Sequence, residues 1–175
     1  ERFALFGVPY DLADGARIRL VAVDAVDNAA EVSFVDRFFP KPFDSETIAL
    51  SESFMSRVVP PILANTPDLK DQGSALENYL MVNRELRRKN AQELVAYAAT
   101  SKPQFLWSRT FLQMPNAKVM SAFADRRSYV LDGREVDQQD HLGFDLASTQ
   151  RAEIPAVNDG VVLMAKYFGI YGNTV

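Results

Sequence analysis

The spacing of apolar residues changes character twice along the chain. In residues 1–40 apolar and polar positions alternate, most clearly from Ile18 to Val23, with the two-residue period of a β-strand. Residues 24–28 are rich in Asp and Asn and predict a turn, and residues 31–35 predict the next strand. We therefore expect β-structure in the first stretch.

Residues 41–104 follow the three-and-four spacing of an amphipathic helix. Ser51 is a candidate N-cap for a short helix that is expected to stop near Val59, where Pro60 and Pro61 follow. A stronger helix is predicted from about Ser74, and a second helical piece covers residues 92–99. The apolar stripe of the stronger helix comprises Leu76, Tyr79, Leu80, Asn83 and Leu86. The four basic residues in 84–89 are expected to face water, with contact to an anionic polymer as the alternative.

Residues 105–175 return to short apolar runs separated by turns. Trp107, with Phe105 and Phe111, is expected to pin the helical region to this last stretch. Turns are predicted at residues 132–133 and 158–160, and residues 161–167 predict a buried strand. Residues 171–175 predict the start of a further strand that the end of the sequence cuts, so we expect a truncated domain.

These patterns predict an α+β fold with three parts. A mainly antiparallel β domain, truncated, occupies residues 105–175, preceded by a helical region at 41–104 and a few strands at 1–40. The stretch Leu20–Asp24, followed by Asp27 and Asn28, resembles the closing strands of immunoglobulin-like bacterial surface modules. That resemblance implies that residues 1–40 are the end of such a module.

Composition removes several classes of function. The 175 residues carry a net charge of −4, which gives no electrostatic footprint for nucleic acid, and no apolar run is long enough to insert into a membrane. Cysteine is absent, which excludes disulfides, thiolate metal sites and cysteine nucleophiles. No glycine-rich phosphate-binding motif is present. His141 is the only histidine, so any chemistry that needs an imidazole within this chain depends on it.

The segment with the clearest candidate metal ligands is residues 141–145, His-Leu-Gly-Phe-Asp. Imidazole nitrogen and carboxylate oxygen are both zinc ligands. In a straight strand, His141 and Asp145 would share a face but stand about 13 Å apart, too far to hold one ion. We therefore expect a bent or bulged strand, with Gly143 as the residue that permits the bend.

The sequence around this pair shows several linked motifs in a fixed order. The His-x-x-x-Asp segment at 141–145 is followed by Pro-Ala-x-x-Asp-Gly-x-Val at 155–162 and by Tyr-Gly-Asn-x-Val at 171–175. From residue 116 onward this series resembles the beginning of the catalytic domain of the lysostaphin and LytM-like zinc endopeptidases. The helical stretch before it resembles, more loosely, the preceding region in a subgroup of large members.

The resemblance implies that His141 and Asp145 are the first two zinc ligands. The family's third ligand and its two catalytic histidines belong to later Tyr-x-His and His-x-His segments, and these 175 residues contain neither. No catalytic residue is therefore assigned within this chain, and the chain by itself is expected to be inactive and to bind zinc poorly. The implied activity of the longer protein is metal-assisted hydrolysis of peptidoglycan peptides.

Four further residues are candidates with smaller roles. Arg126 and Arg127 are candidates for contacting an acidic wall peptide, with surface salt bridges as the alternative. Tyr171 is a candidate for lining a substrate groove, with core packing as the alternative. The resemblance makes Asn116 a candidate for covering the zinc in a latent form.

Three functions remain open at this point. The first is a zinc endopeptidase in the periplasm or at the outer surface of a bacterium, cutting peptide cross-links of peptidoglycan. The second is a regulator on the same scaffold that binds the wall or activates another hydrolase. The third is a surface adhesion module built on residues 1–40. Retention of both His141 and Asp145 favours the enzyme, and no pattern indicates an oligomeric state.

Overall fold

The computed structural model describes residues 6–13, 18–33 and 41–175, and the chain divides into two compact units, Glu1–Asp44 and Ser45–Val175. In the first unit, β1 (Arg19–Val23) and β2 (Ala29–Ser33) form an antiparallel hairpin. The Asp24 carboxylate closes its turn by accepting hydrogen bonds from the backbone N–H groups of Val26 and Asn28, each at 2.9 Å.

The two predicted strands and the turn between them are confirmed, although the end of the second predicted strand, residues 34–35, lies outside the described residues. Every residue of both strands is exposed, so the hairpin buries neither face within the described part of the chain. An immunoglobulin-like sandwich needs about seven strands. The assignment to such a module therefore stays a prediction.

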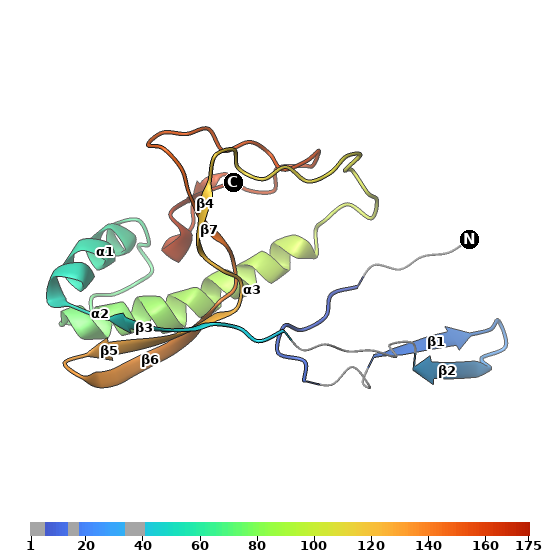
Figure 1. The fold of residues 1–175 in the computed structure, drawn as a ribbon, viewed down its shortest axis with the longest axis horizontal. Helices are drawn as coiled ribbons and strands as arrows, with labels where there is room; N and C mark the ends of the chain where they lie inside the picture. Colours follow the sequence, from blue (N-terminus) through green and yellow to red (C-terminus); the bar gives the residue numbers. More distant parts are fainter. Residues whose placement is uncertain (1–5, 14–17, 34–40) are drawn as a thin grey trace. The chain divides into compact units, whose positions relative to one another are not determined.

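A three-stranded sheet forms the base of the second unit (Figure 1). Its order is β3 (Ser45–Ala49), β5 (Asp125–Leu131) and β6 (Arg134–His141), with β3 parallel and β6 antiparallel to β5. Asp132 and Gly133, with φ of 50° and 76°, make the tight turn between β5 and β6, as the sequence predicts. The strand β3 was not predicted, because only helical periodicity was expected after residue 44.

Helix α1 (Glu52–Ala64) begins where it was predicted to begin but ends later. The Ser51 hydroxyl accepts a hydrogen bond from the Phe54 N–H at 3.2 Å, which confirms the N-cap. The expected stop at Pro60 and Pro61 is wrong, because the helix continues through both prolines. Proline has a helical φ, although it removes a backbone donor and its ring crowds the carbonyl four residues earlier. The Asn65 side chain closes the last turn by donating to the carbonyl of Pro61 at 2.8 Å.

A single long helix follows, composed of α2 (Ala75–Met81), a π-helical segment η2 (Val82–Leu86) and α3 (Arg87–Ala98). Ser74 caps it: its hydroxyl accepts from the Glu77 N–H at 3.2 Å and donates to the Glu77 carboxylate at 2.9 Å. The predicted start is thus confirmed, and the division into two helical pieces is wrong. The helix runs without a break from Ala75 to Ala98, with the π turn in its middle.

The two helices cover the sheet through an aromatic core. The buried members are Leu50, Met55, Val59, Tyr79 and Tyr129. The ring of Tyr79 makes edge-to-face contacts with Phe54 at 6.2 Å and with Tyr129 at 6.0 Å, measured between ring centroids. This core joins α1, the long helix and β5, and so holds the sheet on which the candidate site is built.

The rest of the second unit consists of two short antiparallel ladders. One pairs β4 (Lys118–Ser121) with β7 (Asp145–Ala147), and the other pairs β8 (Lys166–Tyr167) with β9 (Asn173–Thr174) around a short 3-10 turn, η3 (Gly169–Tyr171). The predicted α+β class with mainly antiparallel sheets is confirmed. No helix in the described residues has both the length and the apolar character needed to cross a membrane.

The predicted buried strand at residues 161–167 is wrong over most of its length. Only Lys166 and Tyr167 are in a strand, and Val161 and Val162 are exposed, Val162 to 68%. β-branched residues favour a strand only where a neighbouring strand and a covering layer are available. Within the described residues, 161–165 pair with no strand.

Candidate metal site

The candidate site lies at a corner where one two-stranded ladder continues into another. β5 pairs with β6 up to the pair Asp125 and His141, and β4 pairs with β7 from the pair Ser121 and Asp145. Both strands leave the ladder between these pairs, over residues 122–124 on one side and 142–144 on the other. Figure 1 shows the β4–β7 arm turning away from the β5–β6 hairpin at this point. We call this place the corner.

Local contacts on both strands hold the corner in shape. Asp125 accepts a hydrogen bond from the Ala122 N–H at 2.8 Å, and the Ala124 N–H donates to the His141 carbonyl at 2.6 Å. Ala124 takes a left-handed φ of 67°, which completes the turn on that side. The rings of Phe123 and Phe144 stack across the corner with centroids 6.5 Å apart. The bend is therefore fixed by the backbone of both strands together.

The bend brings His141 and Asp145 together. The Nε2 atom of His141 lies 3.4 Å from the Oδ1 atom of Asp145, against about 13 Å for the same spacing in a straight strand. The imidazole side chain is only 14% exposed and the carboxylate 56%. The Nε2 atom is buried and makes no hydrogen bond within the described structure. A buried polar atom without a hydrogen-bond partner is rare in folded proteins and calls for an explanation.

This pair fits two ligands of a tetrahedral zinc ion. Nitrogen and oxygen ligands that each lie about 2.1 Å from zinc stand roughly 3.4 Å apart at the tetrahedral angle. The distance between His141 Nε2 and Asp145 Oδ1 has this value. A catalytic zinc needs a third protein ligand, and in the part of the chain that the structure describes no group of three His, Cys, Asp or Glu side chains is placed to hold a metal.

Gly143 does not have the role that the sequence suggested. Its φ is not in the left-handed region, and a Cβ atom built on it would meet nothing within 4 Å. The expectation that glycine is what permits the bend is therefore wrong. The corner bends because both ladders break together, and an alanine at position 143 fits the same path.

Arg127 is a charged residue that lies close to Asp145 at the corner. Its Nη2 atom lies 3.5 Å from Asp145 Oδ2 and contacts the hydroxyl of Ser121, and its Nε atom lies 3.7 Å from the Glu46 carboxylate. Its side chain is 15% exposed. These contacts favour the salt-bridge interpretation of Arg127 over contact with a substrate.

The other predicted site residues lie elsewhere. Arg126 is exposed and pairs with Asp140 at 3.3 Å. Tyr171 is half exposed in η3 and stacks on Phe168 at 5.6 Å. Asn116 is exposed before β4 with a φ of 54°, and its carbonyl accepts from the Ser148 hydroxyl at 3.5 Å. Within the described residues, none of the three has a hydrogen bond or ion pair to His141 or Asp145.

The acidic residue four positions before His141 serves a different purpose. Asp137 accepts hydrogen bonds from Asn83 at 2.7 Å and from Arg84 at 2.9 Å. It therefore ties β6 to the long helix. The basic residues of that helix segment, Arg84, Arg87, Arg88 and Lys89, all contact groups of this same chain.

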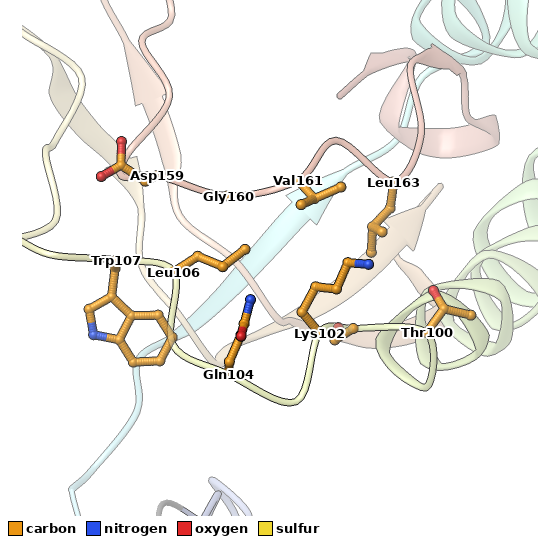
Figure 2. Close-up of a pocket in the computed structure, with 10 residues that line it drawn as sticks. Thr100, Lys102, Gln104, Leu106, Trp107, Asp159, Gly160, Val161 and Leu163 are labelled. Carbon is orange, nitrogen blue, oxygen red and sulfur yellow. The ribbon is translucent and has the colours of Figure 1, made fainter.

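A separate hollow of about 230 Å³ lies between residues 100–107 and 159–163 (Figure 2). Its walls include Trp107, whose ring contacts those of Phe105 and Phe111, and Asp159, which accepts from the Ser108 hydroxyl at 3.1 Å. The three rings contact one another and remain exposed, whereas hydrogen bonds join this segment to residues 157–159: the Asn158 amide donates to the Arg109 carbonyl at 2.7 Å, and the Leu112 N–H donates to the Val157 carbonyl at 2.8 Å. None of the corner residues lines this hollow.

No protein-family model, no characterised protein and no solved structure matches this chain.

Proposed function

We propose that this chain carries the first two zinc ligands, His141 and Asp145, of a lysostaphin-type endopeptidase that hydrolyses peptide cross-links of peptidoglycan. The observation that supports the proposal is the 3.4 Å separation of His141 Nε2 and Asp145 Oδ1, with the nitrogen buried and without a hydrogen-bond partner. The motifs at residues 155–162 and 171–175 support the choice of family.

In this proposal the two side chains make different contributions to binding the zinc ion, one a nitrogen lone pair and the other a negative charge. His141 lies on β6 with a side chain that is only 14% exposed, and in its neutral form it would offer a lone pair at Nε2. Asp145 supplies negative charge from the more exposed side of the corner. When bound, zinc lowers the pKa of a coordinated water to about 7 and polarises the scissile carbonyl. The third ligand and the proton-transferring histidines belong to later motifs of the family, in a longer protein.

The substrate and the cellular setting follow from the same proposal. The substrate is a peptide of the bacterial wall, and the protein works in the periplasm or at the outer surface of the cell. Nucleic acid is not a proposed partner, because the net charge of −4 gives no attraction for it.

Zinc binding tests the proposal directly. Wild-type chain is titrated with zinc in competition with a chelator, alongside His141→Ala and Asp145→Ala. We expect weak binding of one ion to the wild type, since two protein ligands are fewer than a catalytic zinc normally has, and at least a tenfold loss in each variant. Asp140→Asn is the matched control, because this carboxylate is also on β6 and pairs with Arg126. Equal affinity in all four proteins would refute the site.

Catalysis is tested on a longer protein that also carries the later histidine motifs. Purified cross-linked wall is incubated with this protein, and released muropeptides are measured with and without a chelator. Zinc-dependent release supports the peptidase. A protein that holds zinc and releases nothing from cross-linked wall supports the non-catalytic regulator instead.

A further inference from the structure

Arg127 joins three strands around the candidate metal site. From β5 it contacts the hydroxyl of Ser121 at the end of β4, and its Nη2 atom lies 3.5 Å from Asp145 Oδ2 at the start of β7. Its Nε atom is buried, makes no hydrogen bond in the described structure, and lies 3.7 Å from Glu46 Oε2 on β3. Without a metal, the guanidinium is therefore held beside Asp145 by contacts with three strands.

The two oxygens of Asp145 face different partners. Oδ1 lies 3.4 Å from His141 Nε2, and Oδ2 lies 3.5 Å from Arg127 Nη2. An arginine stays protonated under all physiological conditions. The Oδ2 atom therefore already lies beside a positive charge, whereas Oδ1 is the oxygen that would bind a metal together with His141.

We propose that Arg127 competes with the metal for the Asp145 carboxylate. Its guanidinium offsets the negative charge of Asp145 and thereby lowers the affinity of the His141–Asp145 pair for zinc. The inference rests on the proposed function, because it concerns the same two ligands. It goes further in assigning a role to a residue that is not itself a ligand. A metal that enters the corner gains less from Asp145 while Arg127 remains beside it.

The alternative role for Arg127 is to orient Asp145 as a ligand, and the geometry argues against it. At 3.5 Å the contact with Asp145 is at the long limit of a hydrogen bond, where directional holding is weak. Coulomb attraction falls only with the first power of distance, so most of it remains at 3.5 Å. The closer contact of the guanidinium is with Ser121. Charge is therefore the main effect of Arg127 on Asp145.

The test compares the zinc affinities of four proteins by titration against a chelator. Arg127→Gln removes the charge and keeps a hydrogen-bond donor, and we expect it to bind zinc roughly tenfold more tightly than wild type. Arg127→Lys keeps the charge and loses the planar fork, and we expect it to stay within about threefold of wild type. Arg126→Gln removes the neighbouring charge, which is exposed and paired with Asp140, and we expect no change.

The outcomes separate this inference from the proposed function. Zinc bound by wild type with equal or weaker binding by Arg127→Gln overturns the inference and leaves the two-ligand site intact. Tightening in Arg127→Lys as large as in Arg127→Gln also overturns it, because charge is then not the cause. Zinc bound by none of the four proteins overturns both.

A measurement on the wild type covers the case in which Arg127→Gln fails to fold, as judged by circular dichroism. The guanidinium signals of Arg127 are followed by nitrogen NMR during a zinc titration. Competition predicts that these signals shift as the guanidinium loses its contact with Asp145. Signals that stay in place while zinc binds would overturn the inference.

Discussion

Gly169 is a position where the backbone and a neighbouring side chain both require glycine. Its φ is +48°, and a Cβ atom built on it would lie 2.3 Å from the Oδ1 atom of Asn90. That same oxygen accepts a hydrogen bond from the Ile170 N–H at 3.2 Å. Asn90 is buried on the long helix, so this contact anchors η3 to the helix.

We predict that Gly169→Ala lowers the free energy of unfolding by about 2 kcal/mol or more, because it adds left-handed strain and a steric clash. Gly143→Ala is the control: its φ is unstrained and its surroundings are open, so a change within about 0.5 kcal/mol is expected. Urea unfolding of the three proteins measures both values. A loss in Gly143→Ala as large as in Gly169→Ala would restore the structural role that the sequence suggested for Gly143.

Asp71 gives the stability a specific dependence on pH. The amide of Asn78 and the backbone N–H of Gly73 each donate to its carboxylate at 2.8 Å and lower the pKa of Asp71 below its usual 3.8. A lowered pKa in the folded state means that the contribution is present above 3.8 and is lost as the pH falls below that value. We expect the urea midpoint of wild type to fall more steeply in this acid range than that of Asp71→Asn. Parallel profiles would contradict the assignment.

At the scale of single residues, the sequence predicted that His141 and Asp145 would lie close together, but not that Arg127 would lie beside them. Counting outward from the turn at residues 132–133 pairs His141 with Ala124. The structure pairs it with Asp125, because Val136 is an extra residue on β6 and shifts the register by one. Such a bulge depends on packing across the sheet and leaves no signature in the hydrophobic pattern. The approach of Arg127 to Asp145 therefore could not be predicted.

At the scale of elements, the long helix is joined to the sheet by a buried polar contact. Asn83, in the π-helical segment, donates to the Asp137 carboxylate on β6 at 2.7 Å and accepts from Arg87 at 2.8 Å. Arg84 reaches the same carboxylate from the more exposed side. Asn83 and Arg84, which are consecutive residues of the π-helical segment, thus both donate to Asp137 on β6.

We predict that Asn83→Ala destabilises the protein by about 1–3 kcal/mol, because Asp137 loses a donor in a buried position. Arg88→Ala on the same helix removes only an exposed pair with Glu85 and should cost less than about 0.5 kcal/mol. Thermal unfolding of both variants checks the difference. A cost for Arg88→Ala equal to that for Asn83→Ala would mean that the buried contact adds nothing to the helix–sheet junction.

Local signals predicted the starts of the helices well and their ends poorly. The serines at positions 51 and 74 act through the backbone of their own helices, so the sequence contains all that determines them. The persistence of α1 through two prolines depends on the burial of Met55 and Val59 against the core, which is a tertiary effect. The strand β3 was missed for the same reason, because β5, with which it pairs, lies some 80 residues later in the chain.

At the scale of the whole molecule, the site depends on contacts between distant parts of the chain. β3 and β5 pair across the predicted boundary between the helical region and the last stretch, and the aromatic core fixes the helices to the same sheet. Alternation and turn residues predict the α+β class because they act over a few residues. The order of strands in the sheet depends on long-range pairing, which one sequence does not reveal.

The corner also constrains how the chain can vary in length. The sum of the paired residue numbers is the same for Asp125 with His141 as for Ser121 with Asp145, because both strands cross the corner with equal numbers of residues. One residue inserted between His141 and Asp145 alone would turn the carboxylate to the opposite face of its ladder. Insertions at the corner would therefore have to occur on both strands at once. We expect related sequences to differ in length in other loops instead.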